Sequence, residues 1–404
     1  MSSPNKDAAL ASPGLSGGRP SAGAFTFKIF HGPEGLADLR DSWDRLVTGL
    51  PNPGFMQFYS WYDGYMRALE AEPRSVRFLV ASSADGPVGI FALKSSSRRL
   101  AGVPVRTLEI PTHPHSLLCD FVFSPDARGV ALLAALVEHL HRLHDIPWEV
   151  LVMPGLLETS SAWSALRGTP NSRIVSDEVR RCHYVLCRDF ENQLGMKARA
   201  QLRKKRERLA GLGTLSLEVA ERPDDVARAT ADFIAVEGSG WKGSAGSAIR
   251  CDPRLVEFYQ SVAAGFAARG AAQITLLRLD GRCIAGQYGL RGGRSLYLLK
   301  IGYDEEYATM SPGQVLRDWS LRENAARGAI DEVNFGTPTA ERWHPESYAV
   351  FEAMAFRRSL RGHVAYVAVR AKRALRPAYR RWADRWARLR RGTGSQRESG
   401  ASTE

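Results

Sequence analysis

Long apolar runs are absent from this sequence, and that absence excludes one class of protein. No stretch of about 18 uninterrupted apolar residues occurs, so we expect no transmembrane helix. The N-terminal residues, MSSPNKDAALASPGLSGGRPSAG, contain no apolar core of the kind that a secretory signal needs. Cysteine is also scarce, and the absence of a Cys-x-x-Cys pair favours a reducing compartment over a disulfide framework or a structural zinc site. The five cysteines are scattered over positions 119, 182, 187, 251 and 283.

The motifs of several enzyme classes are missing as well. No G-x-G-x-x-G follows a strand-like run and no G-x-x-x-x-G-K-[ST] occurs, which argues against a dinucleotide-binding domain and a P-loop. The absence of G-x-S-x-G argues against a serine hydrolase of the α/β type. One stretch, THPHSLLCD (112–120), gathers residue types that bind metals, but Pro114 separates its histidines and no second cluster completes a site. We therefore expect no metal and interpret this stretch, with His113, His115, Cys119 and Asp120, as a loop lining the cleft between two domains.

Positive charge is concentrated near the C-terminus. The sequence contains 55 Lys and Arg against 43 Asp and Glu, a net charge of +12. Between residues 370 and 391, ten Lys or Arg stand against one acid, so this segment alone carries +9. Tyr379, Trp382 and Trp386 are interleaved with the arginines, which is typical of an amphipathic helix on an anionic membrane surface. We predict a basic amphipathic helix over 366–391, with nucleic-acid binding and a solvated terminal helix as the alternatives.

The pattern of apolar residues indicates two α/β units of similar design. The first is expected over 25–185 and the second over 186–365, with disordered tails at 1–24 and 392–404. Strands are predicted at 25–30, 76–82, 88–95, 107–111, 120–124, 149–154, 182–187, 214–220, 273–280, 283–291, 295–304 and 332–336. Helices are predicted at 36–47, 57–69, 130–143, 191–211, 224–237, 253–268 and 312–327.

One strand-to-helix connection has the composition of an anion-binding site. The predicted strand 295–304 leads through a short loop into Ser311-Pro312-Gly313-Gln314, which opens a helix. Ser311 suits an N-cap, Pro312 suits the first helical turn, and Gly313 lets a ligand approach the backbone. The N–H groups at a helix start match a phosphate or pyrophosphate. From these residues alone, a helix that is simply well capped is the alternative.

A second informative stretch, FIAVEGSGWKGSAGSAI (233–249), is rich in Gly, Ser and Ala and cannot fill a core. Long loops of this kind inside a domain tend to be functional or disordered, and Trp241 argues against disorder. Glu237 is a candidate general base here. A surface carboxylate beside a loop anchor is the alternative interpretation.

Several stretches, taken in order, resemble one family. They are FMQFYSWYDGYM (55–66), KARAQLRKKRERLAGLG (197–213), SGWKGSAGSAI (239–249), CIAGQYGL (283–290) and LYLLKIGYDEEYATMSPGQVL (296–316). Together they are similar to the GNAT-type acyltransferases of the BioF2-like, or CelD/BcsL, group, which are related to the Fem-type aminoacyltransferases. The resemblance covers about 55–360 and is most specific in the second half, where several motifs agree in order and spacing.

The resemblance implies a fold, a reaction and a set of site residues. The fold is α/β (α+β), with two tandem GNAT-like domains, each a mixed, mainly antiparallel sheet flanked by helices, plus the basic C-terminal helix. The reaction moves an acyl group, in the simplest case acetyl, from acyl-CoA to an amine or hydroxyl of a small-molecule or saccharide acceptor. The residues implied for CoA binding are Lys300, Ser311, Gly313, Gln314 and Val315. Glu237 and Asp304 are candidate bases, Tyr303 is a candidate acid, and the acceptor site includes Trp241, Lys242 and Asn334.

One departure from the family pattern affects the chemistry. Many relatives carry an Asp in the strand after the CoA helix and a Tyr-Lys pair soon afterwards, where this sequence has Asn334 and Glu341-Arg342. Asn cannot act as a base, so either the acceptor differs or this position is structural.

Three hypotheses follow. The first is a cytoplasmic acyl-CoA-dependent enzyme of polysaccharide or cell-envelope biosynthesis, peripheral at the inner membrane face through 370–391. The second is a Fem-type transferase that uses aminoacyl-tRNA, the one nucleic acid we expect as a partner. The third is a non-catalytic accessory protein of a polysaccharide synthase. The basic stretch 197–208 would contact CoA phosphates or RNA, or would be a solvated face with Leu202 and Leu209 packed inward.

Overall fold

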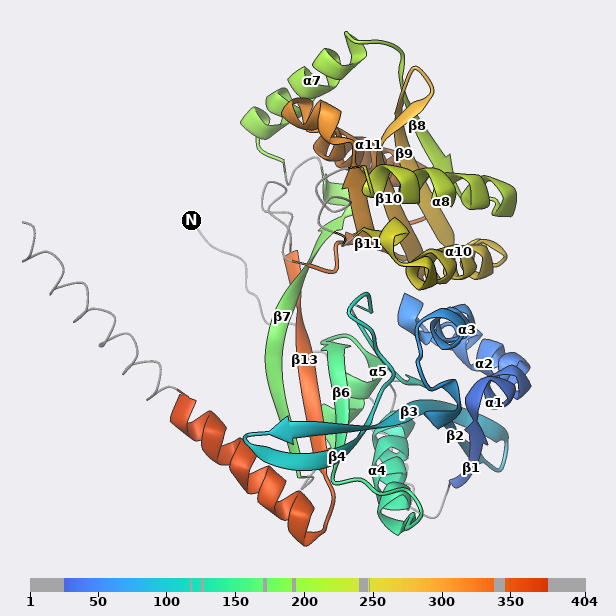
Figure 1. The fold of residues 1–404 in the computed structure, drawn as a ribbon, viewed down its shortest axis with the longest axis vertical. Coiled ribbons are helices and arrows are strands. Elements are labelled where there is room, and N and C mark those ends of the chain that lie inside the picture. The colour runs from blue at the N-terminus through green and yellow to red at the C-terminus, as the bar shows by residue number, and fades with distance from the viewer. Residues whose placement is uncertain are drawn as a thin grey trace, which may run out of the picture.

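The computed structural model describes most of the chain (Figure 1). The described residues are 25–116, 118–124, 127–169, 173–190, 194–239, 246, 248–337 and 346–376. The tails predicted at 1–24 and 392–404 lie outside them, as does the basic segment beyond residue 376. Within this part of the chain, the strands form one 13-stranded sheet that is mixed and mainly antiparallel. Helices cover both of its faces, so the predicted α/β class is confirmed.

The first half of the chain builds one end of this sheet. Its strands run in the order β1-β2-β3-β4-β6, with β5 paired to β3, and only β4 and β6 are parallel. Their bounds are β1 Thr26–His31, β2 Val76–Ser83, β3 Gly86–Leu100, β4 Val103–Glu109, β5 Val122–Phe123 and β6 Val150–Leu157. The helices are α1 Gly32–Asp38, α2 Arg40–Thr48, α3 Tyr59–Ala68, α4 Ala127–Arg142 and α5 Ser161–Gly168. Successive side chains of β2 point to opposite faces of the sheet and so pack in two different cores. Phe78 packs with α1, α2 and α3, whereas Leu79 packs with α4 and α5.

The second half builds the other end. Its strands are β8 Leu215–Ala220, β9 Ala272–Leu279, β10 Arg282–Gly292, β11 Ser295–Tyr303 and β12 Glu332–Asn334. Its helices are α7 Met196–Ala210, α8 Pro223–Glu237, α10 Pro253–Ala267 and α11 Pro312–Arg327. Leu276 of β9 packs with α8 and α10, whereas Leu277 faces α7 and α11 on the opposite side of the sheet. Strands β8 to β11 are antiparallel neighbours, and β11 and β12 are parallel.

Two long strands join the halves. Strand β7 (Ile174–Leu186) pairs with β12 at one end and, along most of its length, with β13 (Glu346–Phe356). Strand β13 follows the second half in the sequence, yet it lies between β6 and β7. The boundary predicted at 185/186 stays a prediction, but one continuous sheet crosses that point.

The halves also meet through helices α3 and α10. A Cβ on Gly64 would lie 2.5 Å from Cγ2 of Val262, and a Cβ on Gly265 would lie 2.7 Å from Cβ of Ser60. Glycine at both positions therefore lets the two helices approach closely. Trp61 packs edge-on against Phe258 in the same contact, with ring centroids 5.2 Å apart. One apolar core thus runs through both halves.

The described chain ends in a helix over 360–376. It begins six residues before the predicted start at 366, and the rest of the predicted helix, 377–391, lies outside the described residues. In the part of the chain that the structure describes, no helix is long and apolar enough to cross a membrane.

Candidate active site

The connection from β11 to α11 is well ordered by local contacts. Strand β11 runs into a short 3-10 helix, η6 (Glu305–Met310), where the sequence predicted a loop. Ser311 then adopts a left-handed conformation, with φ 52° and ψ 58°, before Pro312 starts α11. Its carbonyl accepts hydrogen bonds from the N–H groups of Gln314 and Val315, at 2.9 and 3.3 Å. Of the predicted CoA residues, Ser311, Gly313, Gln314 and Val315 therefore lie in one tight turn.

A cation from α7 reaches this turn. The Lys205 ammonium donates to Ser311 Oγ at 3.0 Å and to Gln314 Oε1 at 2.8 Å. The serine hydroxyl makes no capping bond to the helix, so its main described contact is with the lysine. In the basic stretch, Leu202 and Leu209 are buried, as expected of a solvated helix with its apolar side packed inward. Lys205 lies at the start of α11. Contact of this stretch with CoA phosphates or RNA stays a prediction.

A groove of about 440 Å³ runs between α7 and α11 beside this turn. Four arginines and one acid line it, so its potential is positive. The full lining is Met196, Arg199, Ala200, Leu202, Arg203, Arg206, Val315, Asp318 and Arg322. The Arg206 guanidinium also lies 3.9 Å from the ring centroid of Trp319, which holds α7 against α11.

The short strand β12 pairs with only the first part of β11, from Ser295 to Tyr297. The remainder of β11 carries Lys300 and Tyr303, and the Tyr303 side chain is 39% exposed. A Cβ on Gly313 would lie 3.5 Å from Cδ1 of Tyr303, an ordinary contact, so the turn and the end of β11 are neighbours.

Asn334 ends β12 and is fully buried. Its Oδ1 accepts the Gly336 N–H at 2.9 Å, whereas its Nδ2 has no hydrogen-bond partner among the described residues. Buried polar atoms are usually paired, so an orphaned amide nitrogen is a feature that a ligand could explain.

Glu237 is the last residue of α8 and is 3% exposed. Its Oε2 accepts the Ile249 N–H at 3.0 Å. The residue lies directly over β11, because a Cβ on Gly302 would be only 2.5 Å from its Cα. A buried carboxylate at the negative end of a helix dipole is unfavourable for stability, which is typical of a residue kept for function.

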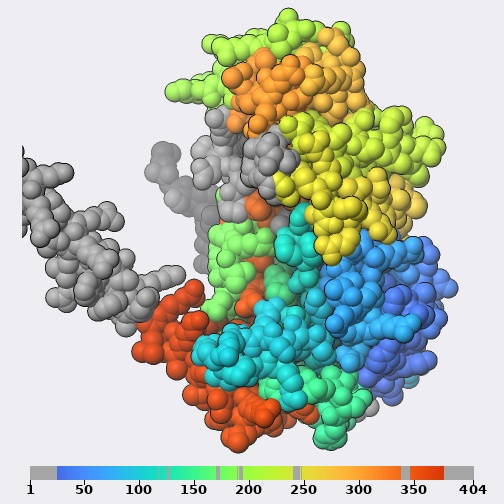
Figure 2. All heavy atoms as spheres, viewed as in Figure 1, coloured from blue at the N-terminus to red at the C-terminus, as the bar shows by residue number. Residues whose placement is uncertain are grey.

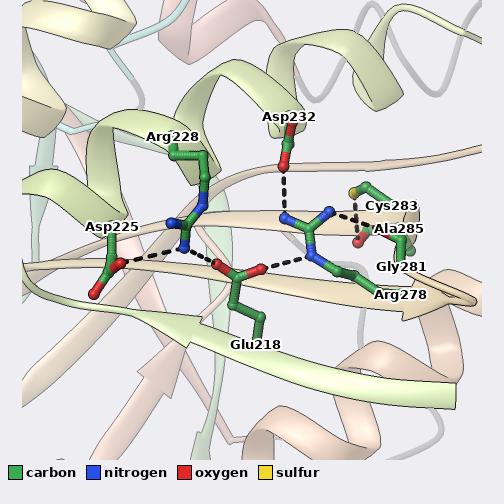
Figure 3. Close-up of polar contacts among 8 residues, drawn as sticks. All are labelled: Glu218, Asp225, Arg228, Asp232, Arg278, Gly281, Cys283 and Ala285. Carbon is green, nitrogen blue, oxygen red and sulfur yellow. Dashed lines mark hydrogen bonds and ion pairs between the residues drawn. The ribbon is translucent and has the colours of Figure 1, made fainter.

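A charged network fixes α8 to the sheet and so fixes Glu237 (Figure 3). The Glu218 carboxylate on β8 lies 2.9 Å from Arg228 of α8 and 2.6 Å from Arg278 of β9. Arg278 in turn lies 2.5 Å from Asp232, again on α8. These ion pairs thus link α8, the helix that carries Glu237, to both β8 and β9.

The carboxylate of Asp304, the other candidate base, already forms a hydrogen bond and an ion pair. It accepts the Glu306 N–H at 3.1 Å and pairs with Arg282 at 2.5 Å. These contacts cap η6 and hold the loop, so its role as a base stays a prediction. Trp241 and Lys242, predicted at the acceptor site, lie outside the described residues, as do Glu341 and Arg342.

The structure also places a histidine and a tyrosine together that the sequence did not connect. His115 Nδ1 lies 3.0 Å from the Tyr259 hydroxyl, across the contact between the halves. Burial, together with the Glu237 charge, raises the pKa of Tyr259. His115 therefore lies at the junction between the halves, whereas Asp120 of the same stretch accepts an N–H group at the start of α5. That the stretch 112–120 lines a cleft stays a prediction. Among the described residues, no group of three or more His, Cys, Asp or Glu could hold a metal ion.

The turn, the strand and the basic helix all fall within one recognised domain. Residues 196–344 match the family model of an acetyltransferase (GNAT) domain. The matched segment begins with α7 and contains Glu237, the whole of β11 and the whole of α11. The narrower resemblance to the BioF2-like or CelD group stays a prediction.

Several solved structures share the overall fold, and nearly the whole length of each aligns with this chain. The C-terminal domain of a putative lysylphosphatidylglycerol synthetase from Agrobacterium fabrum is 13% identical, with a TM-score of 0.51, covering 84% of this chain and 97% of that one. FemX is 10% identical, with a TM-score of 0.51, covering 80% and 96%. A conserved protein of unknown function from Bacteroides thetaiotaomicron is 14% identical, with a TM-score of 0.50, covering 80% and 97%. At these identities the likeness shows the fold alone. A comparison with curated proteins found none that matches.

Proposed function

We propose that this protein transfers an acyl group, acetyl in the simplest case, from acyl-CoA to an amine or hydroxyl of a small-molecule or saccharide acceptor. The observation that carries the proposal is the position of Lys205, which brings an ammonium to a glycine-containing helix start inside a GNAT domain. The residues of this turn fit a phosphate group. Lys205 supplies charge, the start of α11 supplies its positive dipole end, and Gly313 presents no side chain.

The remaining site residues have proposed roles in the reaction. Acyl-CoA supplies an activated thioester, so the protein has mainly to position the acceptor and move protons. Glu237 accepts the proton of the acceptor, and Tyr303 at the end of β11 donates one to the departing thiolate. Between the two candidate bases we favour Glu237, because Arg282 neutralises Asp304. Lys300 contributes to CoA binding.

The acceptor side includes Trp241, Lys242 and Asn334 in this proposal. The orphaned Nδ2 of Asn334 can donate a hydrogen bond but cannot remove a proton, so it would orient an acceptor oxygen. In this proposal the acceptor belongs to the cell envelope or is a polysaccharide, and the chain belongs to the BioF2-like group that its sequence motifs resemble. Five free cysteines support a cytoplasmic location.

One observation favours a second candidate function. The groove beside this turn is lined by Arg199, Arg203, Arg206 and Arg322, and these cations would suit the phosphates of an aminoacyl-tRNA donor. This alternative keeps the same catalytic centre and changes only the donor.

Calorimetric titration of CoA into matched variants tests the donor site. Lys205→Met should weaken CoA binding about tenfold or more, because a hydrogen bond from a charged donor contributes roughly 1.5–3 kcal/mol. Lys204→Met removes the same charge from an exposed position on the same helix and should leave binding nearly unchanged. Gly313→Phe should abolish binding by filling the turn, whereas Gly313→Ala should not. If Gly313→Phe binds CoA as well as the parent chain does, the donor site is elsewhere. Binding of aminoacyl-tRNA without CoA would favour the second candidate.

A further inference from the structure

The helix over 360–376 has apolar residues on two opposite faces. Its inner face is anchored, since Ala365 and Val369 are buried in a core cluster with Phe356 of β13. Arg373 on the same face forms an ion pair with Asp177 of β7 at 2.6 Å. The orientation of the helix on the protein is therefore fixed.

The outer face carries large apolar side chains in solvent. Leu360, Val364, Val367 and Leu375 are 81%, 48%, 49% and 65% exposed. They make up four of the eight large apolar side chains that are exposed in the described residues, so they are a concentrated feature. At about 100° of rotation around the helix axis per residue, these four side chains and Ala371 fall within an arc of roughly 80°. They form one stripe, which we call the outer stripe.

Cations flank the outer stripe on both sides. Helical spacing places Arg361 and Lys372 along one edge and Arg370 along the other, next to His363. No Asp or Glu occurs between 360 and 376. Three acids near this helix are already paired: Asp177 with Arg373 on the inner face, Glu138 with Arg358 just before the helix, and Glu149, which lies near Arg361, with Arg106.

We propose that the outer stripe lies on an anionic lipid bilayer, with its aliphatic side chains at the boundary between headgroups and acyl chains and its flanking cations on lipid phosphates. An apolar stripe bordered by Lys and Arg is the layout of an interfacial helix. Figures 1 and 2 show the helix at the surface, in red, at the end of the molecule away from α7 of the GNAT domain. Membrane binding through this helix goes beyond the proposed acyl transfer, which does not itself require a membrane.

Two other occupants fit the layout less well. A second copy of this chain would meet the stripe through the same surface, which would set the cationic edges of the two copies against each other. A nucleic acid would contact the cations but would leave the aliphatic stripe in water, because backbone binding relies on charge and base stacking relies on aromatic side chains.

Sedimentation of the full chain with vesicles tests this proposal. The parent should bind vesicles of phosphatidylcholine with about 30% phosphatidylglycerol, and increasing salt should release it. Val364→Asp with Val367→Asp should weaken binding about tenfold or more, because both charges would enter the boundary region. Leu212→Asp is the matched control, since Leu212 is similarly exposed, at 54%, in the turn after α7, and binding should not change. Arg361→Gln with Arg370→Gln and Lys372→Gln should weaken binding to the anionic vesicles and should leave any weak binding to pure phosphatidylcholine unchanged.

Circular dichroism and thermal melting should show that all these variants fold, because each substitution is on the surface. Either of two results would overturn the proposal. One is a parent chain that does not bind anionic vesicles at low salt, and a loss of dimer or of tRNA binding in the double variant would then identify the other occupant. The second is a double variant that binds these vesicles as well as the parent does. CoA affinity should be unaffected throughout, so failure here is distinguishable from failure of the proposed function.

Discussion

Glu237 combines burial with a fixed position, and both properties suit a general base. The Ile249 N–H holds one of its carboxylate oxygens, and Gly302 lets the residue sit directly on β11. Any side chain at position 302 would displace it, since the nearest backbone atom is 2.5 Å from a Cβ built there. The glycine thus sets the distance between Glu237, the proposed base, and β11.

Replacing this carboxylate should affect turnover far more than binding. Glu237→Gln should lower kcat about 100-fold or more if the residue is the base, with CoA affinity changed by less than about twofold. The glutamine retains an oxygen for the Ile249 N–H, so the melting temperature should change little. Steady-state rates and calorimetry on both proteins provide the measurement. A variant with the parent's rate at every pH would remove Glu237 from the mechanism.

At the scale of elements, Asp120 organises the start of α5. Its carboxylate accepts N–H groups from Phe121 at 2.8 Å, Ser161 at 2.8 Å and Ala162 at 3.0 Å. The side chain is completely enclosed, and burial raises its pKa to about 7, against the opposing effect of these three donors. In the unfolded chain the same group titrates near 4.

This difference gives a pH dependence of stability with a definite sign. Because the folded protein holds the Asp120 proton more tightly, the stability due to this group is complete below about pH 4 and is lost as pH rises to about 7. Asp120→Asn should remove this slope and should also cost about 1–3 kcal/mol, because its amide nitrogen would face a helix N–H. Urea unfolding of both proteins between pH 4 and 8 measures the difference. Equal slopes would contradict the raised pKa.

Elements with strong local signals could be predicted from the sequence. Helix α11 has its predicted bounds, since Pro312 opens it and Gly328, with φ 67°, closes it. Where the signal was weaker the prediction was wrong, as in the single helix expected over 36–47, which is divided at Leu39 into α1 and α2. Neither α5 nor β13 was predicted. The partners of β13 lie far back in the sequence, so nothing local marks it as a central strand.

The same reasoning applies to the site. The sequence located the turn at Ser311–Val315, because proline and glycine at a helix start are local features. It could not single out Lys205 among seven cations on one helix, since that choice depends on how α7 crosses α11. It also could not pair His115 with Tyr259, because that contact is made between the halves.

At the scale of the whole molecule, β13 makes the two halves interdependent. Its Val350 and Ala353 are fully buried, and it pairs with β6 on one side and β7 on the other. Without it, two central strands would expose unpaired edges.

A chain that ends at residue 337 should therefore lose the fold of its first half. Hydrogen exchange should show amides of β6 and β7 unprotected, whereas a chain that ends at residue 376 should protect them as the full chain does. Addition of a separate 338–376 peptide should restore part of the protection, because the strand needs no covalent link to pair. Full protection of β6 in the shorter chain would show that β13 is dispensable.

The place of β13 also sets the order of events during synthesis on the ribosome. Strands β6 and β7 are made by residue 186, but the strand that belongs between them is complete only at residue 356. At about 5–20 residues per second, the nascent chain must wait roughly 10–30 s with that gap open. Over this interval the first half is an unfinished sheet with unpaired strand edges, while β8, β9, β10 and β11 can pair with strands close to them in the sequence. We therefore expect the N-terminal half of the chain, although it is made first, to depend more on chaperones than the second half does.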